Sequence, residues 1–180
     1  MTASVYKLLH AQTKYPLHLG ITEAGTEYNG IIKSAIGIGS LLLEGIGDTI
    51  RVSLTAPPED EIKAAKAILK ALGLRSGIDV ISCPTCGRCD IDLISITGEV
   101  EARLRKLDRE PDLTIAVMGC VVNGPGEASQ ADYGISGTGI SSAGIAGAAK
   151  PEGVIFAKGK IVKKVPMNEL IDELFKVMEI

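Results

Sequence analysis

The sequence predicts an α/β protein in which strands and helices alternate along the chain. Short apolar runs alternate with segments whose apolar residues recur at helical spacing. Several of the apolar runs lead directly into a polar or glycine-rich loop. Hydrophobic residues make up 46% of the 180 residues, which is ample for a buried core. These observations predict parallel β/α units with right-handed crossovers, in which chemistry gathers at the carboxyl ends of the strands.

The first part of the chain contains three predicted strands and three predicted helices. Val5, Leu8 and Leu9 recur at helical spacing, and another helix begins at Pro57 and Pro58, since proline is favoured in a first helical turn. The predicted strands are residues 17–21, 49–54 and 78–82, and the predicted helices are residues 2–13, 30–43 and 57–72.

The second part of the chain combines strands and helices with a long glycine-rich segment. The predicted helices are residues 98–107 and 167–178, and the predicted strands are residues 113–118, 154–157 and 160–165. Nine of the 21 glycines lie from Gly119 to Gly153, so this segment is predicted to be mostly loop. A domain boundary is expected between Ala71 and Ile78.

The composition argues against two classes of partner. The formal net charge is -3 and aromatic residues make up 3% of the chain, which leaves few basic patches or stacking rings for nucleic acid. No apolar run approaches the roughly 20 residues needed to span a bilayer, and the N-terminus lacks a basic segment followed by an apolar one. We therefore expect no nucleic-acid binding, no membrane association and a cytoplasmic location.

Four cysteines without a secretory signal, in a chain of this size, indicate metal or redox chemistry rather than a disulfide framework. Cys83, Cys86 and Cys89 form two overlapping C-x2-C steps directly after a predicted strand, and Cys120 follows another strand. Thiolates at this spacing can face one metal centre, with a further ligand from a distant loop. The spacing alone is compatible with an iron-sulfur cluster, structural zinc, a thioredoxin-like dithiol or inert buried cysteines.

The surroundings of Cys120 favour a reactive site over a structural one. Zinc sites usually pair two cysteine or histidine knuckles, whereas Cys120 has no second knuckle in the sequence. Asn123 and Glu127 follow it closely, separated by Gly-Pro-Gly, so an amide and a carboxylate are brought near the same site. We therefore favour the hypothesis that these cysteines bind an iron-sulfur cluster.

Four segments of the sequence resemble the 4-hydroxy-3-methylbut-2-enyl diphosphate synthases, the iron-sulfur enzymes of the methylerythritol phosphate route to isoprenoids. The segments are long, and they occur in the order found in that family. They are residues 16–25 (PLHLGITEAG), 45–54 (GIGDTIRVSL), 83–86 (CPTC) and 119–127 (GCVVNGPGE).

The resemblance runs from about Tyr15 to the end of the sequence, but it covers only the later part of a family member. It implies the last strands and helices of a (β/α)8 barrel over residues 1–73, followed by a small α/β iron-sulfur domain over residues 74–180. We therefore expect this chain to be a piece of a longer protein.

The resemblance also implies the cluster ligands. In this family three cysteines and one glutamate hold a 4Fe-4S cluster, and the matching positions are Cys83, Cys86, Cys120 and Glu127. A carboxylate is a harder and more exchangeable ligand than a thiolate, so it suits an iron that must accept a substrate oxygen.

The sequence departs from the family pattern at Cys89, where a non-cysteine residue is usual. Cys89 is therefore a rival fourth ligand, and an all-thiolate cluster would favour electron transfer over substrate binding. The intact Asn-Gly-Pro-Gly-Glu segment leads us to favour Glu127 over Cys89.

Three more residues match functional positions of the family. Glu23 matches an acidic residue that can handle a proton near the substrate, although it could instead cap the next helix. Ser53 and Asn123 match positions that contact the substrate, although either could be a turn residue. His18 is expected to be a core histidine, and Arg51 could face either a diphosphate or a structural carboxylate.

The resemblance implies an oxidoreductase that converts 2-C-methyl-D-erythritol 2,4-cyclodiphosphate into 4-hydroxy-3-methylbut-2-enyl diphosphate. Its electron donor would be ferredoxin or flavodoxin, and the protein would be a homodimer. In the family most basic groups for the diphosphate come from earlier barrel strands, so we expect this chain alone to bind the cluster but to turn over poorly or not at all. The alternative is a non-enzymatic zinc-binding or electron-transfer module with Cys83, Cys86, Cys89 and Cys120 as ligands.

Overall fold

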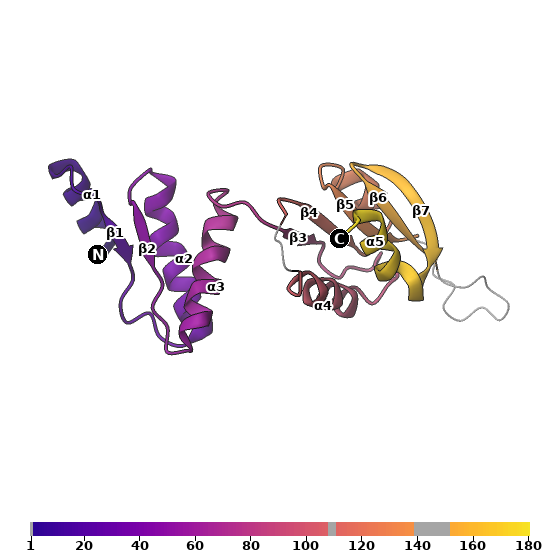
Figure 1. Cartoon of the computed structure of the whole chain (residues 1–180), viewed down its shortest axis with the longest axis horizontal. Coiled ribbons are helices and arrows are strands. Elements are labelled where there is room, and N and C mark those ends of the chain that lie inside the picture. Colours follow the sequence, from indigo (N-terminus) through magenta and orange to yellow (C-terminus); the bar gives the residue numbers. More distant parts are fainter. Residues whose placement is uncertain (1, 108–110, 139–151) are drawn as a thin grey trace. The chain divides into compact units, whose positions relative to one another are not determined.

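A computed structural model describes residues 2–107, 111–138 and 152–180 of the chain, apart from the side chains of Pro125 and Glu127 (Figure 1). The chain divides into two compact units, Met1–Ser76 and Gly77–Ile180, and the division falls between Ala71 and Ile78. Each unit combines strands with helices, so the predicted α/β class is confirmed.

Unit 1 (Met1–Ser76) is a two-stranded parallel sheet with three helices. Its elements are α1 (Thr2–Gln12), β1 (His18–Gly20), α2 (Glu27–Leu43), β2 (Thr49–Arg51) and α3 (Pro58–Ala71). Leu19 of β1 lies opposite Ile50 of β2 and packs with Ile38 and Leu41 of α2. Ile68 of α3 completes this core, so the sheet and two helices are held by one apolar cluster.

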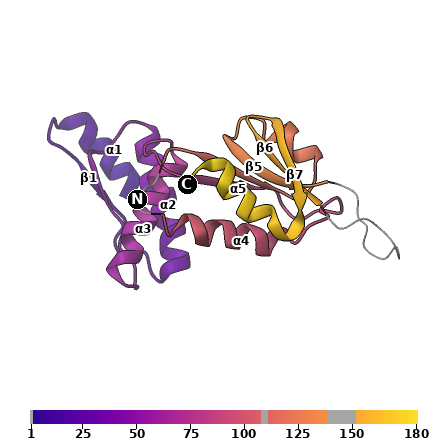
Figure 2. The same ribbon diagram turned by 45° about the vertical axis from the view of Figure 1, so that its right-hand side comes forward.

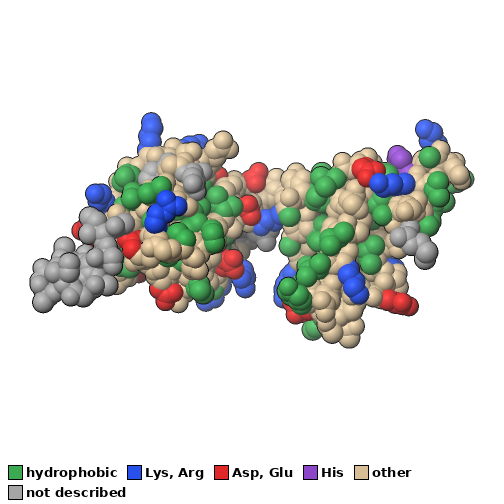
Figure 3. All heavy atoms as spheres, turned by 180° about the vertical axis from the view of Figure 1, so that it is seen from behind, with side chains coloured by type: hydrophobic (Ala, Val, Ile, Leu, Met, Phe, Trp, Pro, Cys, Tyr) green, Lys and Arg blue, Asp and Glu red, His purple; other side chains and the backbone are tan. Residues whose placement is uncertain are grey.

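Unit 1 leaves much of its apolar surface exposed. Helix α1 has no buried residue, and Tyr28, Ile36 and Leu43 of α2 are 76%, 67% and 74% exposed. Figure 3 shows apolar side chains on the surface of this unit. In the described part of the chain, β1 and β2 each pair with one strand only, so each has one edge without a neighbouring strand.

Unit 2 (Gly77–Ile180) is built on a five-stranded mixed sheet. Its elements are β3 (Asp79–Ser82), α4 (Leu93–Leu104), β4 (Thr114–Met118), the π-helix η1 (Val122–Glu127), β5 (Tyr133–Gly137), β6 (Glu152–Ala157), β7 (Lys160–Pro166), the 3-10 helix η2 (Met167–Glu169) and α5 (Leu170–Met178). The strand order is β3-β4-β5-β6-β7, with β3, β4 and β5 parallel and the last two pairings antiparallel.

Alternating side chains of the central strands divide the core of unit 2 into two layers. Val117 of β4 and Ile135 of β5 pack with α4 and α5, which lie on the same face of the sheet (Figure 2). Met118 and Phe156 pack on the other face with Ala128, which directly follows η1. Both faces of the sheet are therefore covered, as parallel strands require.

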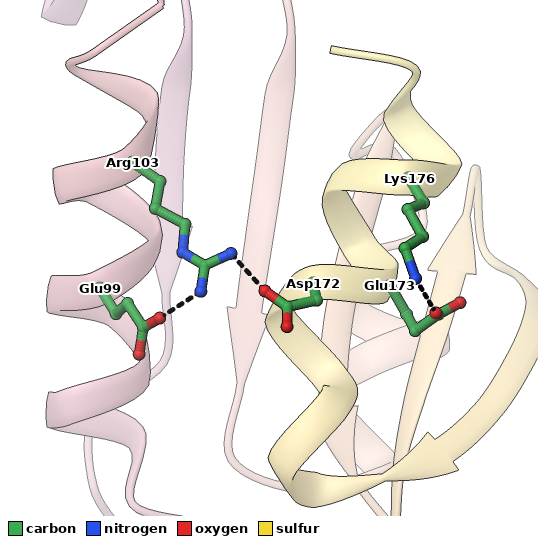
Figure 4. A network of polar contacts seen from close by, with 5 residues as sticks. All are labelled: Glu99, Arg103, Asp172, Glu173 and Lys176. Carbon is green, nitrogen blue, oxygen red and sulfur yellow. Dashed lines mark hydrogen bonds and ion pairs between the residues drawn. The ribbon is translucent and has the colours of Figure 1, made fainter.

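Polar contacts join the two helices on the first face. The guanidinium of Arg103 in α4 donates to Glu99 Oε1 at 2.6 Å and to Asp172 Oδ1 of α5 at 2.5 Å (Figure 4). Arg103 also lies 5.7 Å from the centroid of the Phe175 ring, within the range of a cation-π contact. One side chain thus fixes α5 beside α4.

The structure corrects three expectations about local structure. Helix α4 begins at Leu93 rather than near residue 98, because Asp92 caps it by accepting the Ser95 N–H at 3.2 Å. The glycine-rich segment contains strand β5, and its residues 139–151 lie outside the described part of the chain. His18 is exposed rather than a core histidine, and its Nδ1 lies 2.7 Å from Thr49 Oγ1.

Each helix within the described ranges is too short or too polar to cross a bilayer.

Candidate cysteine site

The parallel pairing of β3 and β4 brings the four cysteines to one edge of the unit 2 sheet. Ser82 at the end of β3 lies opposite Val117 near the end of β4. Cys83 directly follows β3, and Cys120 lies two residues beyond the end of β4. The carboxyl ends of two neighbouring parallel strands therefore present thiols from segments far apart in sequence, as the sequence predicts.

Gly119 lies between two of these thiols. Its N–H donates to Cys83 Sγ at 3.2 Å. A Cβ at position 119 would lie only 2.6 Å from Cys89 Sγ, so only glycine fits without displacing that side chain. Because Cys120 is the next residue, the backbone of Gly119 links three cysteines within one small region.

Cys86 is exposed, unlike the other cysteines, and it begins a tight turn that ends at Cys89. The Cys89 N–H donates to the Cys86 carbonyl at 2.9 Å and closes this turn. The backbone N–H of Arg88 holds the pKa of the Cys86 thiol below its usual value, with help from the Arg88 guanidinium and the Cys89 N–H. The turn therefore favours the thiolate, which is the form that binds metal.

Cys120 is buried, with 4% of its surface exposed, at the entrance to η1. Its Sγ–H points to Asn123 Oδ1 at 3.9 Å, which places the predicted substrate-contacting amide beside a predicted ligand. Glu127 is the last residue of η1, but its side chain lies outside the described part of the chain. The competition between Glu127 and Cys89 for the fourth ligand position therefore stays a prediction.

Ser136 is a residue of this region that the sequence reasoning missed. It is fully buried in β5, and its Oγ has no hydrogen-bond partner among the described residues. A Cβ on Gly124 of η1 would lie 2.7 Å from this oxygen, so the hydroxyl lies directly beneath the Asn-Gly-Pro-Gly segment. A buried hydroxyl without a partner is costly, and no local sequence signal distinguishes it from other strand residues.

The side chains of this site are chemically suited to bind an iron-sulfur cluster, because cysteine thiolates are the usual ligands of such clusters. All four cysteines are free thiols, three of them adjoin Gly119 in space or in sequence, and an orphaned hydroxyl lies under the same loop. Within the described ranges, no three histidine, cysteine or acidic side chains are already gathered around one point as metal ligands.

The functional residues predicted in unit 1 lie at the carboxyl edge of its own small sheet. Gly20 of β1 lies opposite Arg51 of β2, so Glu23 and Ser53 follow the ends of two neighbouring parallel strands. Glu23 is exposed and has a φ of 58°, an unusual conformation for a residue other than glycine. It is not the cap of the next helix, because Thr26 occupies the N-cap position of α2.

Arg51 contacts the same edge. Its Nη2 donates to Thr22 Oγ1 at 3.1 Å, next to Glu23. A guanidinium and a hydroxyl thus lie close together at this end of β1 and β2. The structure assigns Arg51 a hydroxyl partner here, so the choice between a diphosphate and a structural carboxylate stays open.

Comparison with known protein families accounts for most of the chain. Residues 79–180 match the model of the GcpE protein C-terminal domain, and residues 1–66 match the model of the GcpE TIM-barrel domain. The first of these matches alone covers more than half of the sequence. The chain belongs to the GcpE family. The cysteine site lies within the part that matches the GcpE C-terminal domain, and Glu23 and Ser53 lie within the part that matches the GcpE barrel domain.

Curated relatives of this GcpE chain carry the name 4-hydroxy-3-methylbut-2-en-1-yl diphosphate synthase (flavodoxin). The relative from Clostridium perfringens is 57% identical over 97% of this chain and 46% of its own length. Those from Clostridium acetobutylicum and Geobacter sulfurreducens are 54% and 53% identical over 99% of this chain, and 48% and 47% of their own lengths. The chain thus spans about half the length of the curated relatives it matches.

Proposed function

We propose that this chain is part of an oxidoreductase that opens the ring of 2-C-methyl-D-erythritol 2,4-cyclodiphosphate and removes a hydroxyl to give 4-hydroxy-3-methylbut-2-enyl diphosphate. The observation that carries the proposal is that Cys83 and Cys120 follow neighbouring parallel strands at the same end of the unit 2 sheet, within a chain whose relatives bear that enzyme's name. Flavodoxin appears in the relatives' names and is the proposed electron donor, with ferredoxin as the other candidate. The names of the relatives do not favour a non-enzymatic zinc-binding or electron-transfer module.

The proposed cofactor is a 4Fe-4S cluster held by Cys83, Cys86, Cys120 and Glu127. When bound, such a cluster supplies electrons and a Lewis-acidic iron. Two observations support this choice. The burial of Cys120 excludes water from that thiolate, and the Gly119 N–H that donates to Cys83 Sγ would stabilise a thiolate there.

The remaining site residues would bind substrate and move protons. The Asn123 amide, whose Oδ1 lies 3.9 Å from Cys120 Sγ, is proposed to hydrogen-bond a substrate oxygen. The Glu23 carboxylate is proposed to handle the proton that accompanies loss of oxygen, and the Ser53 hydroxyl to hold the substrate. The exposure of Glu23 and its position at the carboxyl end of a parallel strand support these roles.

The proposed arrangement of the longer protein is a (β/α)8 barrel followed by a small iron-sulfur domain, assembled as a homodimer in the cytoplasm. The matches of residues 1–66 and 79–180 to a barrel model and to a separate C-terminal model support this order. A TIM barrel has eight strands, and unit 1 supplies two. We therefore propose that this chain alone binds the cluster but turns over poorly or not at all.

Anaerobic reconstitution with iron and sulfide, followed by metal analysis and Mössbauer spectroscopy, tests this function. Four irons and four sulfides per chain with the spectrum of a 4Fe-4S cluster are the expected result, whereas one zinc and no iron would end the proposal. Cys89→Ser should keep the cluster if Glu127 is the fourth ligand, and Cys86→Ser should lose it. Turnover with reduced flavodoxin by this 180-residue chain would refute the proposed inactivity.

A further inference from the structure

The backbone from Cys86 to Cys89 forms a hydrogen-bonded turn that brings two cysteines to its ends. The Cys89 N–H donates to the Cys86 carbonyl at 2.9 Å, across Gly87 and Arg88. The first and last Cα atoms of a β-turn lie within about 7 Å of each other. Disulfides join residues whose Cα atoms lie about 4.4–6.8 Å apart, so the backbone of this turn is compatible with a disulfide across it.

The other C-x2-C step, from Cys83 to Cys86, lacks this geometry. No backbone hydrogen bond closes a turn between these two residues in the described part of the chain. Pro84 favours an extended backbone at Cys83, and Cys83 Sγ already accepts the Gly119 N–H at 3.2 Å. Of the two overlapping C-x2-C steps in the sequence, only Cys86–Cys89 is closed by a backbone hydrogen bond in the described part of the chain.

The two thiols of the turn have the unequal environments that thiol-disulfide exchange uses. Cys86 is exposed, so its sulfur is accessible to an incoming disulfide. Cys89 is half-buried, its Sγ–H donates to the Ile91 carbonyl at 3.3 Å, and its sulfur lies against Gly119. Cys86 is therefore placed to attack and Cys89 to resolve.

We propose that Cys86 and Cys89 form a redox-active dithiol, which closes to a reversible disulfide in the cluster-free protein. The oxidant is a low-molecular-weight disulfide. The Cys86 thiolate attacks one sulfur of that disulfide, forms a mixed disulfide and releases one thiolate. The Cys89 thiolate then attacks Cys86 Sγ and releases the second thiolate. The protein loses two hydrogens as two protons and two electrons, and both electrons go to the oxidant.

This chemistry gives Cys89 a function that does not require it to bind the cluster. While the disulfide is closed, Cys86 cannot act as a ligand, yet it is protected from irreversible oxidation and returns on reduction. The dithiol itself is independent of the proposed function. Only its effect on cluster loading rests on that function, because it assumes that Cys86 is a ligand.

Disulfide mapping of the full chain tests the dithiol before any iron is added. The chelated, cluster-free protein is equilibrated with oxidised glutathione, alkylated and digested with trypsin. Cleavage after Arg88 separates the two cysteines into peptides 76–88 and 89–103. A Cys86–Cys89 disulfide links these peptides, whereas a Cys83–Cys86 disulfide closes a ring within peptide 76–88. We expect the linked pair and a loss of two hydrogens, both reversed by dithiothreitol.

Three variants make the result specific. The linked pair should persist in Cys83→Ser and disappear in Cys86→Ser and Cys89→Ser. Its persistence in Cys86→Ser would assign the bond to Cys83 and Cys89 and overturn the proposal. An oxidised wild-type protein that forms only the ring within peptide 76–88, or that loses no hydrogens, would also overturn it.

Iron uptake then tests the effect on loading. Oxidised wild-type protein given ferrous iron and sulfide without a thiol reductant should lose most of the uptake shown by the reduced protein, and dithiothreitol should restore it. In Cys89→Ser the mixed disulfide at Cys86 has no resolving thiol, so the oxidised variant should carry one glutathione on Cys86 in place of the linked pair. Equal uptake by oxidised and reduced wild-type protein would refute the effect on loading. No uptake by any sample would contradict the proposed function and leave the mapped dithiol standing.

Discussion

The two units place candidate functional residues at the same kind of position, the carboxyl ends of parallel strands, but support them differently. In unit 2 the five-stranded sheet is covered on both faces, and four consecutive residues of β4 are buried. In unit 1 the sheet has two strands, and β2 contains no buried residue. Cys120 thus follows a buried strand that is paired on both edges. Cys83 follows β3, an edge strand of the same sheet without a buried residue, and Glu23 and Ser53 follow strands that each pair with one strand only in the described part of the chain.

This difference follows from how parallel sheets are stabilised. Parallel sheets usually have both faces covered by helices, and their inner strands are paired on both edges. A parallel strand is therefore stabilised mainly by its contacts with neighbouring strands and helices. A barrel strand completes these contacts only when the barrel closes. Strand β4 therefore has the support that parallel strands require, and β1 and β2 lack it within the described part of the chain.

The largest expected effect is in the covered sheet of unit 2. Phe156 is fully buried, and a Cβ on Gly134 would lie 2.3 Å from its Cζ, so the ring fills the space that this glycine leaves. Phe156→Ala should destabilise unit 2 by about 3–5 kcal/mol. Urea unfolding, with hydrogen exchange of the β5 and β6 amides, measures the change. Ile161→Ala, at a position that is 51% exposed, is the control and should stay within about 0.5 kcal/mol.

Two nearby residues of α2 test whether the exposed face of this helix is also exposed to solvent in solution. Ile38 is fully buried and Ile36 is 67% exposed. Ile38→Ala should cost about 2–5 kcal/mol, and Ile36→Ala should cost less than about 0.5 kcal/mol. Hydrogen exchange of the β1 amides reports both. A cost above about 1 kcal/mol for Ile36→Ala would mean that this face is covered in solution, and the contrast between the units would fail.

A smaller effect is expected where the cysteine site meets the sheet. Gly119→Ala places a methyl group against Cys89 Sγ and should cost about 1–3 kcal/mol through overpacking. Cys89→Ala in the same chain removes that sulfur and should restore much of the loss. Denaturant unfolding of the two single variants and the double variant gives the coupling between them. Additive losses would show that the sulfur is not what the new methyl group meets.

The smallest effect concerns the pH dependence of α5. Hydrogen bonds from Lys163 and then Lys176 lower the pKa of Glu173 from 4.5 to about 2. Because the pKa is lower in the folded state, the stabilisation is fully present above about pH 4.5 and is lost as the pH falls toward 2. Glu173→Gln should therefore be less stable than the wild type at pH 7, with the difference shrinking by pH 3. A difference that is equal at both pH values would contradict this origin.

The sequence predicts most of the elements because they depend on local patterns, and it fails where a tertiary contact decides. The apolar runs before Cys83 and Cys120 predict β3 and β4, and their parallel pairing predicts that the cysteines share one edge. The sequence does not predict strand β5, because its glycines resemble those of a loop. Gly134 is needed there because the ring of Phe156, a residue distant in sequence, occupies the space of a Cβ. The buried Ser136 hydroxyl is likewise not predicted from the sequence, because it is buried only when η1 packs over β5.

The order of the strands in unit 2 has a consequence for how the protein is made. The spatial order β3-β4-β5-β6-β7 is also the order along the chain, so each strand pairs with the one that left the ribosome just before it. The antiparallel β6–β7 pairing is local, whereas the parallel β3–β4 pairing joins residues such as Asp79 and Thr114 that are far apart in sequence. Domains nevertheless begin to fold during synthesis. Pairing of β4 with β3 already juxtaposes Cys83 and Cys120. The nascent chain can therefore pair β3 with β4, and place Cys83 and Cys120 after their ends, before the β6–β7 hairpin has emerged from the ribosome.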